Sequence, residues 1–157
     1  MSPLPAGSPA PDFSLADQQN HTVTLHELRG QPVLIYFYPK AMTPGCTVQA
    51  CNLRDSQADY AAFKVRVLGI SPDPVARLKK FAERDALPFT LLADENHQVA
   101  EAYGVWGPKK FMGKQYDGIH RISFLIDEQG QVEKVFDDFK TSHHHQVVLD
   151  YLQTRQA

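Results

Sequence analysis

The chain has 157 residues, 43% hydrophobic and 22% charged, which is typical of a single globular domain over residues 1–157. Its 16 basic and 18 acidic side chains give a net charge of −2, so no bulk positive field exists for nucleic acid or an anionic membrane. The chain has only two cysteines, Cys46 and Cys51, which excludes a disulfide scaffold and argues against a four-ligand structural zinc site.

The beginning of the chain shows no targeting signal. Residues 1–11 contain four prolines and neither the basic nor the apolar region of a signal peptide. The longest apolar run, residues 32–39, is far shorter than the ~20 residues that span a bilayer. We therefore expect a cytoplasmic protein without a membrane segment, in a reducing compartment where neighbouring cysteines are catalytic rather than structural.

The apolar pattern predicts strands alternating with helices. Residues 13–15 and 22–25 alternate apolar and polar side chains around a polar turn, which predicts an N-terminal β-hairpin. Continuous β-branched and aromatic runs predict buried strands, and apolar residues at helical spacing predict helices. The predicted strands are 33–38, 65–71, 122–127 and its hairpin partner 132–136, and the predicted helices are 74–84, 96–103 and 144–153. This order predicts an α/β fold with a central mixed sheet and helices on both faces.

The most informative segment, residues 38–51, follows directly on the most buried predicted strand. Thr43 is a favourable N-cap and Pro44 a favourable first helical residue, so a helix is predicted to begin there. Cys46 then lies in the first helical turn, where free N–H groups and the helix dipole favour a thiolate, the nucleophilic form of cysteine. Open α/β sheets place their sites at the carboxyl ends of strands, which is where this segment lies.

The separation of the two cysteines predicts what the second one does. In a continuous helix, Cys46 and Cys51 differ by ~500° of rotation and ~7.5 Å of rise, which places their Cα atoms about 8–9 Å apart. A disulfide needs about 4.4–6.8 Å, so the helix must unwind before the two can bond. A lone cysteine is usually a small buried hydrophobe, but the Thr-Pro-Gly lead-in and the second cysteine favour redox chemistry.

The pattern Pro39-x-x-x-Thr43-x-x-Cys46 resembles the active-site signature of the peroxiredoxins, thiol peroxidases with a thioredoxin-like fold. The second cysteine, Cys51, is similar to that of the bacterioferritin-comigratory, or peroxiredoxin Q, branch. The similarity covers nearly the whole chain in the same order. Its further segments are 7–15, 104–107, 121–127 and 137–140.

The resemblance implies a role for each of five residues. Cys46 would be the peroxidatic nucleophile and Cys51 the resolving cysteine. Thr43 would hydrogen-bond the peroxide and the thiolate, and Pro39 would shield the pocket. Arg121 would neutralise the thiolate and polarise the peroxide, as a permanently charged guanidinium can.

The implied function is the reduction of hydrogen peroxide and organic hydroperoxides in antioxidant defence. A sulfenic acid on Cys46 would condense with Cys51 to an intramolecular disulfide. Thioredoxin or a similar dithiol protein, drawing on NADPH, would reduce that disulfide, and no metal, haem, flavin or other cofactor is implied. The chain lacks the Gly-Gly-Leu-Gly insert and the C-terminal cysteine tail of ring-forming relatives, so we expect a monomer. A non-enzymatic redox sensor is the alternative function, and a thioredoxin-like disulfide reductase, disfavoured by the missing Cys-x-x-Cys, is the third.

Three further features are interpreted as follows. Gln49 stands where many members carry Glu, although an amide can still make the hydrogen bond. The residues 143–145, three histidines that open a predicted helix, are interpreted as a solvated helix start rather than a metal site. Residues 107–114 deviate from a phosphate-binding loop in spacing and lack its Ser or Thr, so we interpret them as an exposed loop bordering the active site through Trp106 and Phe111.

Overall fold

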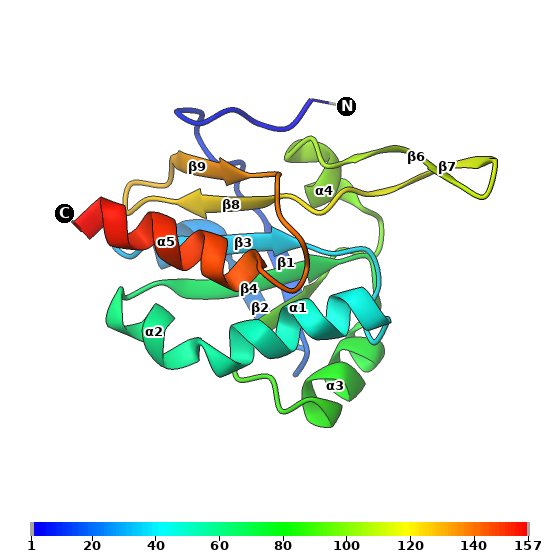
Figure 1. Cartoon of the computed structure of the whole chain (residues 1–157), viewed down its shortest axis with the longest axis horizontal. Coiled ribbons are helices and arrows are strands. Elements are labelled where there is room, and N and C mark those ends of the chain that lie inside the picture. The colour runs from blue at the N-terminus through cyan, green and yellow to red at the C-terminus, as the bar shows by residue number, and fades with distance from the viewer. Residues whose placement is uncertain (1, 157) are drawn as a thin grey trace.

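A seven-stranded mixed β-sheet forms the centre of the protein (Figure 1), which a computed structural model describes over residues 2–156. In spatial order its strands are β2 (Thr22–Thr24), β1 (Ser14–Asp17), β5 (Thr90–Ala93), β4 (Arg66–Ser71), β3 (Val33–Phe37), β8 (Ser123–Ile126) and β9 (Val132–Phe136). The three strands β3, β4 and β5 are parallel, whereas β1, β2, β8 and β9 pair antiparallel with their neighbours. The expected mixed sheet and its N-terminal hairpin are both confirmed.

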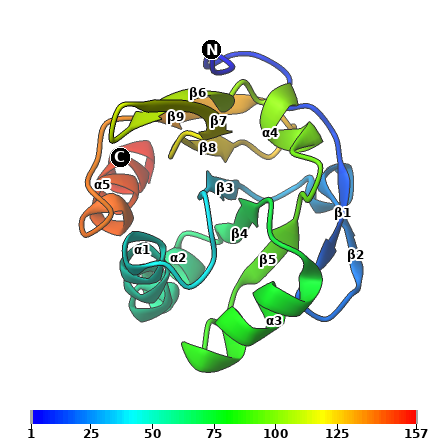
Figure 2. The same ribbon diagram turned by 90° about the vertical axis from the view of Figure 1, so that its right-hand side faces the viewer.

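Helices cover both faces of the sheet, as expected, but unequally (Figure 2). One face packs against α1 (Pro44–Asp55), α2 (Gln57–Ala62), α3 (Val75–Arg84) and α5 (His144–Gln156). The other face packs against α4 (Gln98–Ala102) and the 3₁₀ helix η1 (Leu25–Leu28). Within residues 2–156, none of the helices combines the length and the apolarity needed to cross a membrane.

The central strand β3 separates two hydrophobic cores. Leu34 and Tyr36 point into the core beneath α1 and α5, and Val33, Ile35 and Phe37 point into the core beneath α4. This alternation follows from the period of two along a strand. Because both faces are covered, all five side chains must be apolar or aromatic, which explains the uninterrupted run in the sequence. The loop that leaves this strand therefore starts from the best-packed part of the molecule.

One predicted loop is a β-hairpin. The interpretation of residues 107–114 as a loop is wrong, because β6 (Trp106–Phe111) and β7 (Lys114–Ile119) pair antiparallel and project from the body (Figure 1). The reversal occurs at Met112 and Gly113, with φ of 52° and 80°. Two-residue hairpin turns with positive φ at both central residues favour Asn-Gly, Asp-Gly or Gly-Gly, and methionine rarely adopts a positive φ, so the sequence carried no strong hairpin signal. The prediction that this segment is exposed holds, since Phe111 is 65% exposed.

Candidate active site

The helix that carries both cysteines begins where β3 ends. Helix α1 starts at Pro44 with Thr43 in the N-cap position, as predicted. The Thr43 hydroxyl donates to the carbonyl oxygen of Lys40 at 2.8 Å, within the loop that joins β3 to α1. The carbonyl oxygen of Thr43 accepts the N–H of Thr47 at 2.9 Å, which closes the first helical turn. This geometry places Cys46 near the positive end of the helix.

The Cys46 sulfur lies against a guanidinium from a distant part of the chain. Cys46 is 1% exposed, and the Nη2 atom of Arg121 donates to its Sγ at 3.2 Å. Arg121 stands in the short connection between β7 and β8. A charged donor at this distance stabilises a thiolate and negative charge that develops on a nearby oxygen.

The Arg121 guanidinium also contacts Gln49, which lies one turn after Cys46 on helix α1. Its Nη1 atom donates to Gln49 Oε1 at 3.0 Å, and Gln49 is 1% exposed. Residues three apart on a helix face the same side, so Cys46 and Gln49 together fix the orientation of Arg121. The amide therefore supplies an acceptor at the position where many members of the branch have a carboxylate.

Gly45 allows the guanidinium to approach this closely, a role that the sequence did not reveal. A Cβ atom at Gly45 would lie 3.1 Å from Arg121 Nη2 and 3.8 Å from Thr141 Cγ2. The Nη2 atom that faces Gly45 is the one that donates to Cys46. The only sequence signal for this role was the position of the glycine directly before the cysteine.

Pro39 and the projecting hairpin border a common cavity. The cavity holds about 280 Å³ and lies between the β3–α1 loop and the β6–β7 hairpin. Its lining includes Pro39, Lys40, Pro72, Trp106, Lys109 and Tyr116. Partial burial and the nearby Arg121 charge lower the pKa of Lys109. Trp106 therefore shares a cavity with Pro39, whereas Phe111, the other aromatic residue expected to border the site, is not part of its lining.

Cys51 lies further along the same unbroken helix. Both cysteines are free thiols, and α1 continues through both positions, as predicted for the reduced protein. Cys51 is half-buried, and this burial raises the pKa of its thiol. The helix keeps the two sulfurs on different parts of its surface, so this conformation does not allow a disulfide.

The interpretation of the three histidines as solvated is wrong for the middle one. His144 is 0% exposed, and its Nε2 atom and the Ser123 hydroxyl are 2.8 Å apart. Its ring lies 4.6 Å from that of Phe139 and 5.8 Å from that of Tyr36, measured between centroids. Burial lowers the pKa of His144 to about 3, with the positive charges of His145 and Arg121 acting in the same direction. The sheet supplies a hydroxyl partner at the first turn of α5, which the local sequence could not show.

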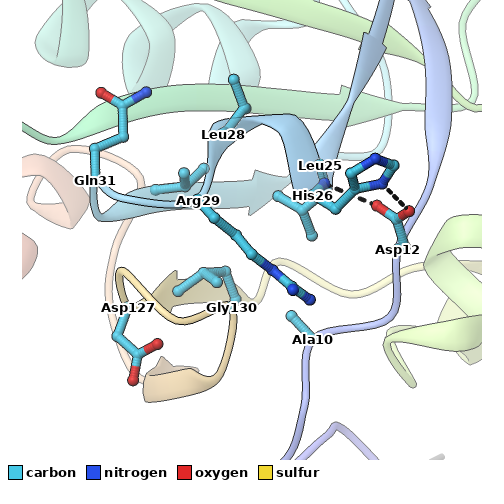
Figure 3. A pocket seen from close by; sticks show the side chains of 11 residues that line it. Ala10, Asp12, Leu25, His26, Leu28, Arg29, Gln31, Asp127 and Gly130 are labelled. Atoms are coloured by element: carbon cyan, nitrogen blue, oxygen red, sulfur yellow. Dashed lines mark hydrogen bonds and ion pairs between the residues drawn. The ribbon is translucent and has the colours of Figure 1, made fainter.

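A second cavity lies at the opposite end of β3 (Figure 3). It holds about 20 Å³, room for roughly one water molecule, and is lined in part by Val33, Arg29 and the hydrogen-bonded pair Asp12 and His26. None of the five residues predicted for the site lines it. Among residues 2–156, no group of three or more His, Cys, Asp or Glu side chains is arranged to hold a metal ion.

The sequence and the fold both identify the family. Residues 6–135 match the AhpC/TSA family, and the chain therefore belongs to that family. Peroxiredoxin Bcp of Escherichia coli strain K12 is 63% identical over 152 residues, which cover 97% of each chain. Peroxiredoxin Bcp of Bacillus subtilis strain 168 is 44% identical over 148 residues, covering 94% of this chain and 92% of the relative.

Solved structures agree with this assignment. The bacterioferritin comigratory protein of Xanthomonas campestris superposes with a TM-score of 0.90 at 29% identity, covering 98% of this chain and 100% of that one. Peroxidoxin BcpB of Mycobacterium tuberculosis superposes with a TM-score of 0.85 at 35% identity, covering 97% and 98%. The expected thioredoxin-like fold, the resemblance to the bacterioferritin-comigratory branch and the enzyme class, a thiol peroxidase among the oxidoreductases, are confirmed.

Proposed function

We propose that the chain is a monomeric cytoplasmic enzyme that reduces hydrogen peroxide and organic hydroperoxides through Cys46, with Cys51 as resolving cysteine and thioredoxin or a similar dithiol protein as reductant. The observation that carries the proposal is the 3.2 Å contact between Arg121 Nη2 and Cys46 Sγ at the start of α1. It combines a nucleophile, a fixed cation and a helix N-terminus within one turn. We place this activity in antioxidant defence.

The first step is attack of the Cys46 thiolate on one peroxide oxygen. An S–O bond forms as the O–O bond breaks, so the sulfur is oxidised by two electrons to a sulfenic acid. The other oxygen leaves with the electron pair, takes up a proton and departs as water or an alcohol. Arg121 stabilises the thiolate and then the charge on the leaving oxygen. The Thr43 hydroxyl, bonded to Lys40 in this structure, would turn to the peroxide, and Pro39 would exclude water from the pocket.

The second step requires α1 to open. Cα atoms about 8–9 Å apart cannot form a disulfide, so the turns between the cysteines unwind before the sulfurs meet. The Cys51 thiol then condenses with the sulfenic acid, giving an S–S bond and water. A dithiol protein restores both thiols by exchange and is itself oxidised to a disulfide. Both cysteines come from one chain, so the cycle needs no second subunit.

One solved relative supports the substrate range. The Xanthomonas campestris bacterioferritin comigratory protein has been described in terms of an alkyl peroxide reduction activity. The open cavity beside Pro39 offers space for the organic part of such a peroxide in this chain. We therefore include organic hydroperoxides among the proposed substrates.

A coupled assay tests the proposal. We expect the wild-type chain with peroxide, thioredoxin, thioredoxin reductase and NADPH to consume NADPH continuously, and Cys46→Ser to abolish this consumption. Cys51→Ser, the matched control, should still lose its Cys46 thiol to one equivalent of peroxide but should not turn over with thioredoxin. Continued turnover by Cys46→Ser would refute the proposal. Oxidation of Cys46 in the wild type without sustained turnover would instead indicate a redox sensor.

A further inference from the structure

The loop between β3 and α1 is held at its middle residue, Ala41, by two side chains from another part of the fold. The N–H of Ala41 donates to Asp73 Oδ2 at 2.7 Å, and the carbonyl oxygen of Ala41 accepts from Arg77 Nη2 at 2.7 Å. Pro39 and Thr43 lie two residues to either side of this point. Both backbone polar groups of one loop residue are therefore fixed from outside the loop.

Asp73 and Arg77 form an ion pair in which each charge faces the backbone group of Ala41 that has the opposite partial charge. Asp73 precedes α3 and Arg77 lies in its first turn, with Arg77 Nε 3.3 Å from Asp73 Oδ1. The carboxylate faces the N–H of Ala41 and the guanidinium faces its carbonyl oxygen, so both contacts are charge-assisted. Asp73 is 6% exposed and also accepts the Ser71 hydroxyl at 2.8 Å. Ala41 itself is fully buried, which shields these contacts from water.

The backbone immediately after this point is strained. Met42 adopts a φ of 67°, in the left-handed region that non-glycine residues avoid. Such a conformation persists only where its surroundings hold it, and the contacts to Ala41 are the adjacent restraint. On the other side, the Tyr38 N–H donates to the carbonyl oxygen of Ile70 at 3.1 Å. The loop is thus fixed to the sheet at its start and to α3 at its centre.

We propose that Asp73 and Arg77 are positioning residues for the peroxide step, acting through Ala41 on Pro39 and Thr43, and that they set the upstream limit of α1 unwinding. This inference rests on the proposed function. Neither residue belongs to the segments that carry the family resemblance, and neither is assigned a contact with the Cys46 sulfur or with the peroxide. We call the pair of Asp73 and Arg77 the clamp. It keeps the β3–α1 loop in place while the turns of α1 downstream of the loop open, so the loop and the helix return to the same conformation after each catalytic cycle.

The clamp is tested by the rate at which Cys46 reacts with peroxide. Asp73→Asn keeps an acceptor for the Ala41 N–H but removes the charge, and Arg77→Met removes the cation while keeping an apolar stem. We expect each to lower the second-order rate constant for hydrogen peroxide by about 10-fold or more in stopped-flow measurements. The double variant should lose no more than the worse single one, because the two residues act as a unit.

The control is an ion pair of similar burial elsewhere. Glu133 on β9 pairs with Arg155 on α5 at 2.8 Å, with side chains 20% and 22% exposed. Glu133→Gln should leave the peroxide rate constant at the wild-type value. Amide exchange adds a local readout: Asp73→Asn should accelerate exchange of the Ala41 N–H but not that of Tyr38.

The outcomes separate the two proposals. Wild-type rate constants in both Asp73→Asn and Arg77→Met would overturn the clamp, and so would a loss matched by Glu133→Gln at equal thermal stability. If one variant fails to fold, the other decides the question. Continued turnover by Cys46→Ser would overturn the proposed function, independently of what the clamp variants do.

Discussion

The distance between Arg121 and Cys46 depends on a residue without a side chain. Gly45 leaves room for Arg121 Nη2, and any Cβ atom there would stand 3.1 Å from that nitrogen. Few real Cβ contacts are so close, so a larger residue would displace the guanidinium by a few tenths of an ångström. The glycine also weakens the first turn of α1, because glycine is the poorest helix former after proline. At this position, glycine therefore favours the reaction of Cys46 with peroxide but lowers the stability of the first turn of α1.

Gly45→Ala is expected to separate these two effects. Alanine should raise the free energy of unfolding by roughly 0.5 kcal/mol, since it loses less backbone entropy in a helix. It should also lower the peroxide rate constant several-fold, about 3- to 10-fold, by moving Arg121 Nη2 from Cys46 Sγ. Thermal denaturation and stopped-flow kinetics measure the two effects.

The exposed Val48 on the same helix supplies the control, because Val48→Ala also favours the helix but does not face Arg121. Val48→Ala should keep the wild-type rate constant. A Gly45→Ala variant that is both more stable and equally reactive would contradict the steric argument.

The position of Cys46 in the first turn of α1 was predictable from its neighbours, because the cap residue Thr43 and Pro44 determine where the helix starts. The contact with Arg121 joins residues 75 positions apart and depends on the pairing of β8 with β3, which brings the β7–β8 connection close to the start of α1, so only the family resemblance suggested it. The burial of His144 was not predicted because it depends on contacts with Ser123 and Phe139. Ser123 is distant in the sequence, and Phe139 lies in a segment without a clear apolar pattern. Asp73 carried no signal at all.

Among the helices, α1 presents two different surfaces. Its buried side consists of Cys46, Gln49, Ala50 and Leu53, the i, i+3, i+4, i+7 spacing of an amphipathic helix. Cys51 lies beside this stripe and is half-buried. No side chain caps the N-terminal N–H groups of this helix within the part of the chain that the structure describes. The first turns are therefore held mainly by packing and by the loop before them, which favours local opening.

Hydrogen exchange should report that opening. We expect amides in residues 43–54 to exchange faster in the disulfide form than in the reduced form, because the cysteines cannot bond across intact turns. Amides of α3 serve as the internal control and should exchange alike in both forms. Equal protection of residues 43–54 in the two redox states would rule out the unwinding step.

Strands and long helices were predictable because each carries a strong periodic signal. The buried strands β3, β4 and β8 were found to within one residue at each end, and α5 began where expected. The short strand β5 has only four residues and follows no turn signal that distinguishes it. Its place in the sheet comes from pairing with β1 and β4, which is information outside its own sequence.

The stability of the molecule should depend on pH through one buried base. His144 in the unfolded chain binds a proton near its ordinary pKa of 6.5, whereas in the folded protein burial lowers that pKa to about 3. The unfolded state thus binds more protons between these values, and the free energy of unfolding falls as the pH falls through them. Above pH 6.5 the contribution is constant. At pH 5 the loss amounts to about 2 kcal/mol.

His144→Gln is expected to flatten this dependence. Glutamine can still hydrogen-bond Ser123 but does not titrate, so the wild type should lose about 2 kcal/mol more than the variant between pH 7 and pH 5. Urea denaturation at each pH measures the difference. The exposed neighbour His143 gives the control, and His143→Gln should follow the wild-type slope. If the free energy of unfolding falls equally with pH in His144→Gln and in the wild type, the buried ring does not cause the loss of stability at acid pH.

The β6–β7 hairpin carries a local excess of positive charge. Residues 106–119 contain three lysines and one aspartate, a net charge of +2, so the rest of the chain carries −4. One of these lysines, Lys109, lines the cavity that Pro39 borders. A neutral molecule such as hydrogen peroxide diffuses to that cavity unaffected by ionic strength, whereas an anion is drawn to it at low salt. The projecting hairpin therefore gives this part of the surface a preference for anions that weakens as salt screens its lysines.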